Sequence, residues 1–191
     1  TSPTIAPLAK EGEVTLRLTS LARTVEEAEA EMQPVLDEIL KRVGTFVYGW
    51  DNDTIEEVLV RLLLDRNLTL ALAESCTGGR ITAALTRLPG VSAHFLGGAT
   101  TYSNESKQAL LKLDATLIEQ HGAVSAQVAE VMAVRIKDEL GADYGLSVTG
   151  VAGPAEQEGK PVGLVYVGIA SPTATKHIVL NLGGTREMIQ H

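Results

Sequence analysis

One short stretch of the chain combines nucleophilic side chains with two glycines: Ala73-Glu74-Ser75-Cys76-Thr77-Gly78-Gly79. It follows the apolar run 68–72 and precedes the amphipathic run 81–88, a pattern that predicts a turn from a strand into a helix. Such a turn exposes side chains beyond the carboxyl end of the strand and aims free backbone N–H groups at one point. It can therefore hold an anion, an oxyanion or a nucleophile.

Ser75 is the first candidate nucleophile, and it requires a nearby base because a serine hydroxyl is a weak nucleophile at neutral pH. The alternative is that Ser75 only caps the following helix. Cys76 is the rival nucleophile, since a cysteine at a helix N-terminus has a lowered pKa, although it can also be a small buried side chain. Thr77 caps the helix or lines the site, and Gly78 and Gly79 allow close approach of a ligand.

A second cluster, Thr100-Thr101-Tyr102-Ser103-Asn104-Glu105-Ser106-Lys107, lies where the predicted strand 95–102 leads into a helix. The carboxyl ends of strands in an α/β sheet share one edge, so this cluster is expected beside the first turn. Lys107 falls one helical turn in, and a desolvated amine there can act as a base. Taken alone, a solvated surface lysine is the ordinary interpretation. Tyr102 adds a hydrogen-bonding group.

A third strand end, Ser147-Val148-Thr149-Gly150-Val151-Ala152-Gly153-Pro154, again carries a hydroxyl and glycines. Thr149 and the N–H groups near Gly150 and Gly153 can cradle a phosphate, although a plain loop has the same composition. The polar segment 155–160 is a candidate rim or lid. Three such strand ends on one sheet indicate a site for a small phosphorylated or carbonyl substrate.

Composition narrows the classes of partner. The formal net charge of −8 gives no overall attraction for nucleic acid or an anionic membrane. The longest apolar runs, such as 162–170, are too short to span a bilayer. A single cysteine excludes an intramolecular disulfide, and no pair of histidines has metal-ligand spacing. We therefore expect a cytoplasmic protein that binds no membrane and no nucleic acid and holds no metal.

Alternating strand and helix patterns predict an α/β fold, a three-layer α/β/α sandwich. The last strands, 162–170 and 177–182, follow each other through a short turn, which makes the sheet mixed. Residues 1–50 form a separate, small α+β piece with a strand at 14–18, a helix from Val25 that Pro34 kinks or divides, and a strand at 46–48. The main domain is then 51–191. Both ends of the sequence look cut, and we expect its last helix to be missing.

The ordered motifs are together highly specific, and they resemble the C-terminal domain of the CinA family over roughly residues 53–191. Residues 1–50 resemble the small KH-like domain that precedes it in that family. The motifs that carry the resemblance are Ala-Glu-Ser-Cys-Thr-Gly-Gly at 73–79, Tyr-Ser-Asn-Glu-Ser-Lys at 102–107, His-Gly-Ala-Val-Ser at 121–125, Thr-Gly-Val-Ala-Gly-Pro at 149–154 and Lys-Pro-Val-Gly at 160–163.

The resemblance implies a serine amidohydrolase without metal or cofactor that converts nicotinamide mononucleotide to nicotinate mononucleotide and ammonia. It implies Ser75 as the nucleophile, Lys107 as the base and Tyr102 as a hydrogen-bonding partner in the proton path. The turn near Thr77 and Gly78 would then supply the oxyanion donors. The 149–153 loop would hold the phosphate. The alternatives are a nucleotide-sensing or interaction module without catalysis, and a phosphate-binding domain that serves an upstream CinA enzyme domain.

Two features depart from the family pattern. The stretch 155–159 carries two carboxylates, Glu156 and Glu158, which we expect to weaken nucleotide binding beside a phosphate loop. The KH-like piece lacks a Gly-x-x-Gly loop and has more acidic than basic residues, which speaks against RNA binding. An uncovered sheet edge or a missing helix would favour a homodimer. The expected partners are thus a small nucleotide, a second copy and the upstream CinA N-terminal domain.

Overall fold

The computed structural model describes residues 2–10 and 12–191. The chain divides into two compact units, Thr1–Asp53 and Thr54–His191. Each unit has its own sheet, of two strands in the first and five in the second. The candidate site residues all belong to the second unit.

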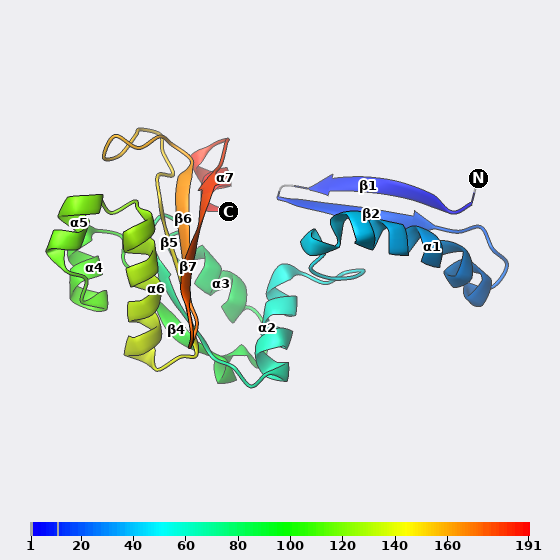
Figure 1. Ribbon diagram of the computed structural model, residues 1–191, viewed down its shortest axis with the longest axis horizontal. Coiled ribbons are helices and arrows are strands. Elements are labelled where there is room, and N and C mark those ends of the chain that lie inside the picture. The colour runs from blue at the N-terminus through cyan, green and yellow to red at the C-terminus, as the bar shows by residue number, and fades with distance from the viewer. Residues whose placement is uncertain (1, 11) are drawn as a thin grey trace. The chain divides into compact units, whose positions relative to one another are not determined.

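The first unit is a β-hairpin with one long helix (Figure 1). Strands β1 (Thr4–Lys10) and β2 (Glu13–Thr19) pair antiparallel along their whole length. Helix α1 (Val25–Val43) begins at Thr24, whose hydroxyl accepts a hydrogen bond from the Glu27 N–H, and it is followed by the 3₁₀ turn η1 (Gly44–Phe46). None of the described residues of these elements is fully buried, so this unit has no closed hydrophobic core.

One sequence expectation for this unit is wrong, and one of the two alternatives for Pro34 is excluded. The stretch 46–48 is not a strand, because β2 already pairs with β1 and the short stretch finds no partner strand. Pro34 does not divide α1, which runs through it. Pro34 and Ala30, whose carbonyl loses its helical donor, both lie on the exposed side of the helix, so water can replace the missing hydrogen bond.

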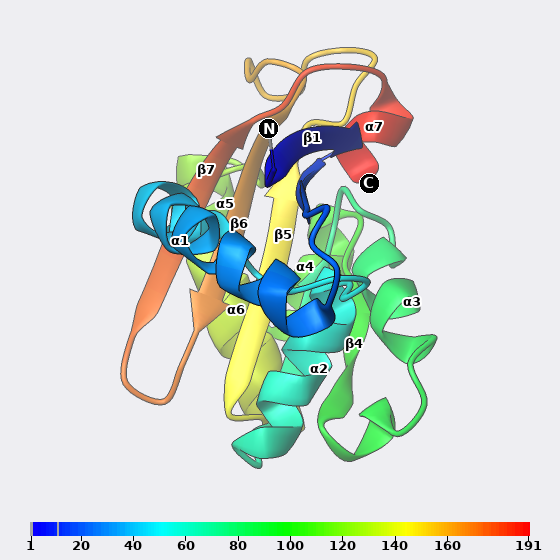
Figure 2. The same ribbon diagram turned by 90° about the vertical axis from the view of Figure 1, so that its right-hand side faces the viewer.

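The second unit contains a mixed five-stranded sheet in the order β4-β3-β5-β6-β7. Strands β3, β4 and β5 are parallel, whereas β6 and β7 continue the sheet antiparallel. Figure 2 shows β5, β6 and β7 side by side. The mixed sheet confirms the prediction. The strands are β3 (Leu70–Glu74), β4 (Phe95–Thr100), β5 (Tyr144–Gly150), β6 (Leu164–Ala170) and β7 (Thr175–Asn181).

Helices cover both faces of this sheet, which makes three layers (Figure 1). On one face lies α6 (Ala126–Leu140), with α4 (Asn104–Leu111) and α5 (Ala115–His121) packed against it. On the other face lie α2 (Ile55–Asp65) and α3 (Arg80–Thr86). The α/β/α sandwich is therefore confirmed.

Strand β3 is the buried centre of the fold, and all five of its residues are buried. Its side chains alternate between the two layers, as the two-residue period of a strand requires. Ala71 and Ala73 contact the cluster around α6, whereas Leu70 and Leu72 contact the cluster around α2 and α3. Because both faces are packed, the end of β3 at Glu74 is held rigidly, and Ser75 follows it directly at the carboxyl edge of the sheet.

The chain ends in a short helix, α7 (Arg186–Gln190), capped by the Thr185 hydroxyl. Its Ile189 is buried in a small cluster with Cys76 and Val148. The Gln190 side-chain amide donates to the Cys76 carbonyl at 2.8 Å. The helix thus packs on the same turn that carries the candidate nucleophile.

Candidate active site

The turn after β3 owes its shape to its two glycines. Gly78 and Gly79 have φ angles of 63° and 95°, in the left-handed region that favours glycine. The Gly78 N–H donates to the Ser75 carbonyl at 3.1 Å, which closes the turn, and α3 begins directly after Gly79. This reversal leaves the Ser75 side chain at the end of the strand, facing the neighbouring loop.

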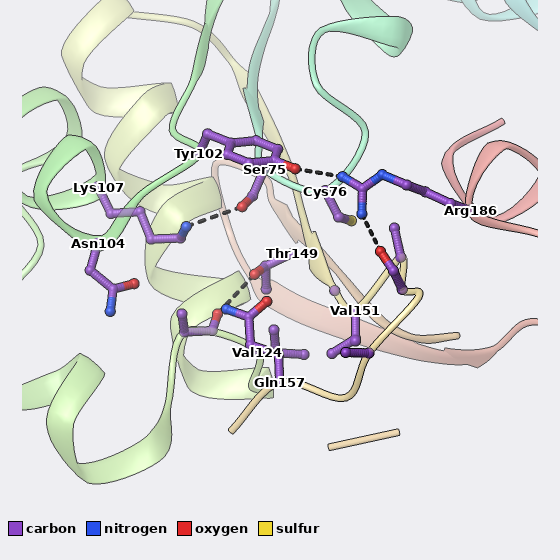
Figure 3. A pocket seen from close by; sticks show the side chains of 15 residues that line it. Ser75, Cys76, Tyr102, Asn104, Lys107, Val124, Thr149, Val151, Gln157 and Arg186 are labelled. Carbon is purple, nitrogen blue, oxygen red and sulfur yellow. Dashed lines mark hydrogen bonds between the residues drawn. The ribbon is translucent and has the colours of Figure 1, made fainter. Parts of the chain in front are cut away.

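Ser75 and Lys107 meet across the carboxyl edge of the sheet, as Figure 3 shows. The Lys107 Nζ donates to Ser75 Oγ at 3.1 Å and to the Thr101 carbonyl at 2.9 Å. A Ser103 cap with the Ser106 hydroxyl starts α4, which places Lys107 one turn in, on the inner side of the helix. The lysine side chain is among the most deeply buried in the molecule, with 2% of its surface exposed.

Burial also sets the protonation of this lysine. Desolvation lowers the pKa of Lys107 from its ordinary value, although the negative charge of Glu158 acts in the opposite direction. Both groups that accept its hydrogen bonds are uncharged oxygens, so neither provides a counter-charge in direct contact. The arrangement therefore makes the charged ammonium less favourable than in an exposed lysine, and a lowered pKa beside a serine hydroxyl is what a general base requires.

Cys76 does not have the properties of the rival nucleophile. Burial raises the pKa of its thiol to about 11, and this outweighs the backbone N–H groups of Cys76 and Thr77 that favour the thiolate. The sequence left two alternatives for Cys76, a thiol with a lowered pKa and a small buried side chain, and the structure shows the buried side chain, because Cys76 lies in the apolar cluster under α7. At neutral pH the side chain is a thiol.

The Thr77 hydroxyl and the N–H groups of Gly78 and Gly79 are bonded within the turn and not available in the cavity. The Thr77 hydroxyl donates to the Glu74 carboxylate at 2.7 Å, and the Gly79 N–H donates to the same oxygen at 3.0 Å. The Gly78 N–H is occupied by the Ser75 carbonyl. The sequence predicts oxyanion or substrate-binding groups at Cys76, Thr77, Gly78 and Gly79. Of the backbone donors in this set, the N–H groups of Gly78 and Gly79 are already bonded, whereas those of Cys76 and Thr77 point toward the Cys76 sulfur.

Tyr102 and Arg186 form the exposed side of the cavity. Tyr102 is 58% exposed, and its hydroxyl accepts a hydrogen bond from Arg186 Nη2 at 2.6 Å (Figure 3). Arg186 Nη1 donates to the Gly153 carbonyl. Tyr102 thus lies in the cavity wall but bonds to the arginine instead of to Ser75 or Lys107. Sequence reasoning missed Arg186, although the capped helix start Gly-Gly-Thr-Arg marked its position.

The third strand end lines the same cavity, whose volume is about 610 Å³ with its open mouth included. Gly150 and Gly153 lie in its wall. Thr149 is buried, and its hydroxyl donates to the Ala123 carbonyl at 2.8 Å, so that hydroxyl is not free to hold a phosphate. The three clusters predicted from the sequence therefore do come together, but with different side chains facing inward.

The segment 155–160 is fastened beside the cavity by two side chains. Glu158 accepts hydrogen bonds from the Ala123 N–H at 3.2 Å and the Val124 N–H at 3.4 Å. Lys160 Nζ lies 3.7 Å from the Glu158 carboxylate and donates to the His121 carbonyl at 2.9 Å. Glu158 is thus held by the connection between α5 and α6.

Within residues 2–10 and 12–191, no group of three His, Cys, Asp or Glu side chains is arranged to hold a metal ion. Among the helices of the same described residues, none is both long and apolar enough to cross a membrane.

Fold and site together define a three-layer α/β domain with a buried serine–lysine pair at the carboxyl edge of its mixed sheet. Comparison with known proteins shows the family to which this domain belongs. The chain belongs to the CinA family: residues 52–191 match the CinA C-terminal domain, and residues 1–49 match the damage-inducible protein CinA KH domain.

Relatives agree with this assignment. The chain is 47% identical over 194 residues to a CinA-like protein of Dictyoglomus thermophilum, covering all of this chain and 46% of that protein. It is 47% identical over 186 residues to a CinA-like protein of Synechococcus elongatus, covering 97% of this chain and 44% of that protein. The chain therefore spans about half the length of these curated relatives.

Solved structures of the family share the fold. The crystal structure of a competence-damaged protein (CinA) superfamily protein from Escherichia coli matches with a TM-score of 0.70 and 28% identity, over 78% of this chain and 90% of that one. The competence damage-inducible protein A of Klebsiella pneumoniae matches with a TM-score of 0.68 and 33% identity, over 69% and 83% of the two chains.

Proposed function

We propose that this chain hydrolyses the carboxamide of nicotinamide mononucleotide, releasing nicotinate mononucleotide and ammonia. The observation that carries the proposal is the 3.1 Å contact between Lys107 Nζ and Ser75 Oγ, made by a lysine that is 98% removed from solvent. A buried amine beside a serine at a cavity wall is the arrangement that activates a hydroxyl for acyl transfer. The choice of this nucleotide rests on membership of the CinA family.

In the first half-reaction the neutral Lys107 amine takes the proton of the Ser75 hydroxyl while Ser75 Oγ attacks the carboxamide carbon. The negative charge moves to the carboxamide oxygen, where the N–H groups of Cys76 and Thr77 are the donors that the turn offers. One such donor lowers the activation barrier by about 3 kcal/mol. The Lys107 ammonium then gives its proton to the leaving nitrogen, the C–N bond breaks and ammonia departs.

In the second half-reaction a water molecule attacks the ester that joins the nicotinoyl carbon to Ser75 Oγ. Lys107, neutral again, takes a proton from this water. It returns the proton to Ser75 Oγ as the ester bond breaks, so nicotinate mononucleotide leaves and the serine is restored. Each half-reaction uses the same two side chains, and the sum consumes one water and one amide.

The phosphate of the nucleotide needs an anchor at the exposed side of the cavity. The Thr149 hydroxyl is bonded to Ala123, so Arg186 replaces it as the proposed anchor. Its guanidinium already lies in the cavity wall, held by Tyr102 and the Gly153 carbonyl. A guanidinium that presents several donors in a plane is well suited to a phosphate.

The test is ammonia release from nicotinamide mononucleotide by the wild-type chain, by Ser75→Ala and by Cys76→Ala. The expected result is release by the wild type and by Cys76→Ala, and a loss of at least about 1,000-fold in Ser75→Ala. Absence of release from a folded wild-type chain would exclude the enzymatic function and favour the nucleotide-sensing module. Equal release by Ser75→Ala and the wild type would exclude Ser75 as the nucleophile.

A further inference from the structure

Glu74 is a buried carboxylate that the proposed reaction does not use. It is the last residue of β3, immediately before Ser75, and 1% of its surface is exposed. Burying a charge is costly unless hydrogen bonds replace the lost water. Its environment therefore has to explain why a carboxylate occupies this position.

Five donors surround this carboxylate. One oxygen accepts from the Thr77 hydroxyl at 2.7 Å, the Gly79 N–H at 3.0 Å and the Ile81 N–H at 3.2 Å. The other accepts from the N–H and the hydroxyl of Thr82, both at 2.7 Å. Helix α3 begins directly after Gly79, which has no side chain to cap it, so Glu74 supplies the cap from the end of the preceding strand.

The main chain of Glu74 reaches the other half of the site. Its carbonyl accepts a hydrogen bond from the Thr101 N–H at 2.7 Å, and the Thr101 carbonyl in turn accepts from Lys107 Nζ at 2.9 Å. The side chain of Glu74 fixes the turn that carries Ser75, and its carbonyl fixes the residue that holds Lys107. Both members of the pair are thus attached to one residue.

We propose that Glu74 is a positioning residue: its carboxylate ties the 75–79 turn to the start of α3 and thereby sets the alignment of Ser75 with Lys107 and with the N–H groups of Cys76 and Thr77. This inference rests on the proposed function, in that it assigns Ser75 the role of the nucleophile. A glutamine at this position cannot replace the carboxylate, because its NH₂ group would face two or three donors, depending on which way the amide turns. A displacement of about 1 Å is enough to slow an aligned reaction about 100-fold.

Modification of Ser75 by phenylmethylsulfonyl fluoride tests the alignment without any nucleotide. Ser75 Oγ forms a bond to sulfur, fluoride leaves, and Lys107 takes the proton. Intact-mass spectrometry of wild type, Glu74→Gln and Ser75→Ala gives the rate and the site. We expect labelling of Glu74→Gln to be about 100-fold slower than that of the wild type, with no labelling of Ser75→Ala.

Asp143→Asn is the matched control, because Asp143 is also a carboxylate that accepts two hydrogen bonds, from the N–H and hydroxyl of Thr69 at 2.8 Å each. It lies before β5, at the opposite edge of the same sheet from Ser75. A variant that only loses stability should resemble this control, which we expect to label at the wild-type rate. Kinetics on nicotinamide mononucleotide should show a lower kcat for Glu74→Gln with KM changed less than threefold.

If Glu74→Gln does not fold, Thr82→Val removes one donor and leaves the carboxylate in place, and we expect its labelling to be about tenfold slower than that of the wild type. The inference would be overturned if a folded Glu74→Gln is labelled at a rate within twofold of the wild-type rate. Where only Thr82→Val folds, the same result for that variant would overturn it. A wild-type chain that is labelled faster than Glu74→Gln and still releases no ammonia from nicotinamide mononucleotide would support the positioning role and exclude the proposed function. The two proposals can therefore fail separately.

Discussion

Lys107→Met is the most informative substitution, because methionine fills a similar volume and has no amine. The proposed mechanism assigns all four proton transfers to Lys107, and a positioned base contributes about 10² to 10⁴ in rate. We therefore expect kcat on nicotinamide mononucleotide to fall by that factor, which is about 3 to 5 kcal/mol in activation free energy. KM should change little, since the buried amine contacts Ser75 and Thr101 deep in the cavity wall.

Lys107→Met should lose activity but should be more stable than the wild type. The pKa of Lys107 is lowered in the folded protein by burial, so between that value and the ordinary value the unfolded chain binds more protons than the folded chain. The free energy of unfolding of the wild type therefore rises with pH across this interval, by about 1.4 kcal/mol for each unit of the shift. Lys107→Met lacks this dependence. Its advantage in melting temperature over the wild type should be largest below the lowered pKa and should shrink toward pH 10.5.

Two measurements together test whether Lys107 is the base and whether burial lowers its pKa. Steady-state ammonia release between pH 5 and 10 should show activity of the wild type rising tenfold per pH unit up to the pKa of Lys107 and level above it, because only the neutral amine is a base. Differential scanning calorimetry over the same range compares the two proteins. The reasoning would be refuted by a Lys107→Met variant that keeps more than a tenth of the activity, or by a melting-temperature difference that does not depend on pH.

Three further substitutions probe the rest of the site. Glu158→Gln removes a negative charge that raises the pKa of Lys107, so the acid limb of the pH–rate profile should move to lower pH; an unmoved limb would contradict this influence. Cys76 should react with iodoacetamide at pH 8 about 100-fold more slowly than an exposed cysteine, because its pKa is about 11, and mass spectrometry gives the rate. Arg186→Ala should raise KM for nicotinamide mononucleotide about tenfold or more and leave KM for the phosphate-free riboside unchanged. An equal rise in KM for both substrates would show that Arg186 does not bind the phosphate.

The layers of the fold could be predicted because local periodicity and packing agree in the second unit. The alternation of Leu70, Ala71, Leu72 and Ala73 reads as a fully buried strand, and each of these side chains contacts the layer that its parity predicts. In the first unit the agreement is weaker. β1 was not predicted because its residues do not alternate clearly and it is defined by pairing with β2, a contact that no local pattern contains.

For the site, residue types and spacing were enough to identify Ser75 and Lys107 as the candidate pair, because both follow predicted strands whose carboxyl ends share an edge. The sequence also determined the turn between them, since only glycines readily adopt the backbone of Gly78 and Gly79. The motifs as a set indicated the CinA family before any contact was known. These properties depend on the order of residues along one strand, one turn or one helix.

The tertiary structure alone decided which polar groups face the cavity. It turned the Thr77 hydroxyl to Glu74 and the Thr149 hydroxyl to Ala123, and it brought Arg186 to Tyr102 across 84 residues of chain. The tertiary structure also decided the pKa shifts of Lys107 and Cys76, because the neighbours that desolvate them are distant in sequence. Burial lowers the pKa of Lys107 and keeps Cys76 a thiol, and the density of packing around a residue is a property of the folded chain.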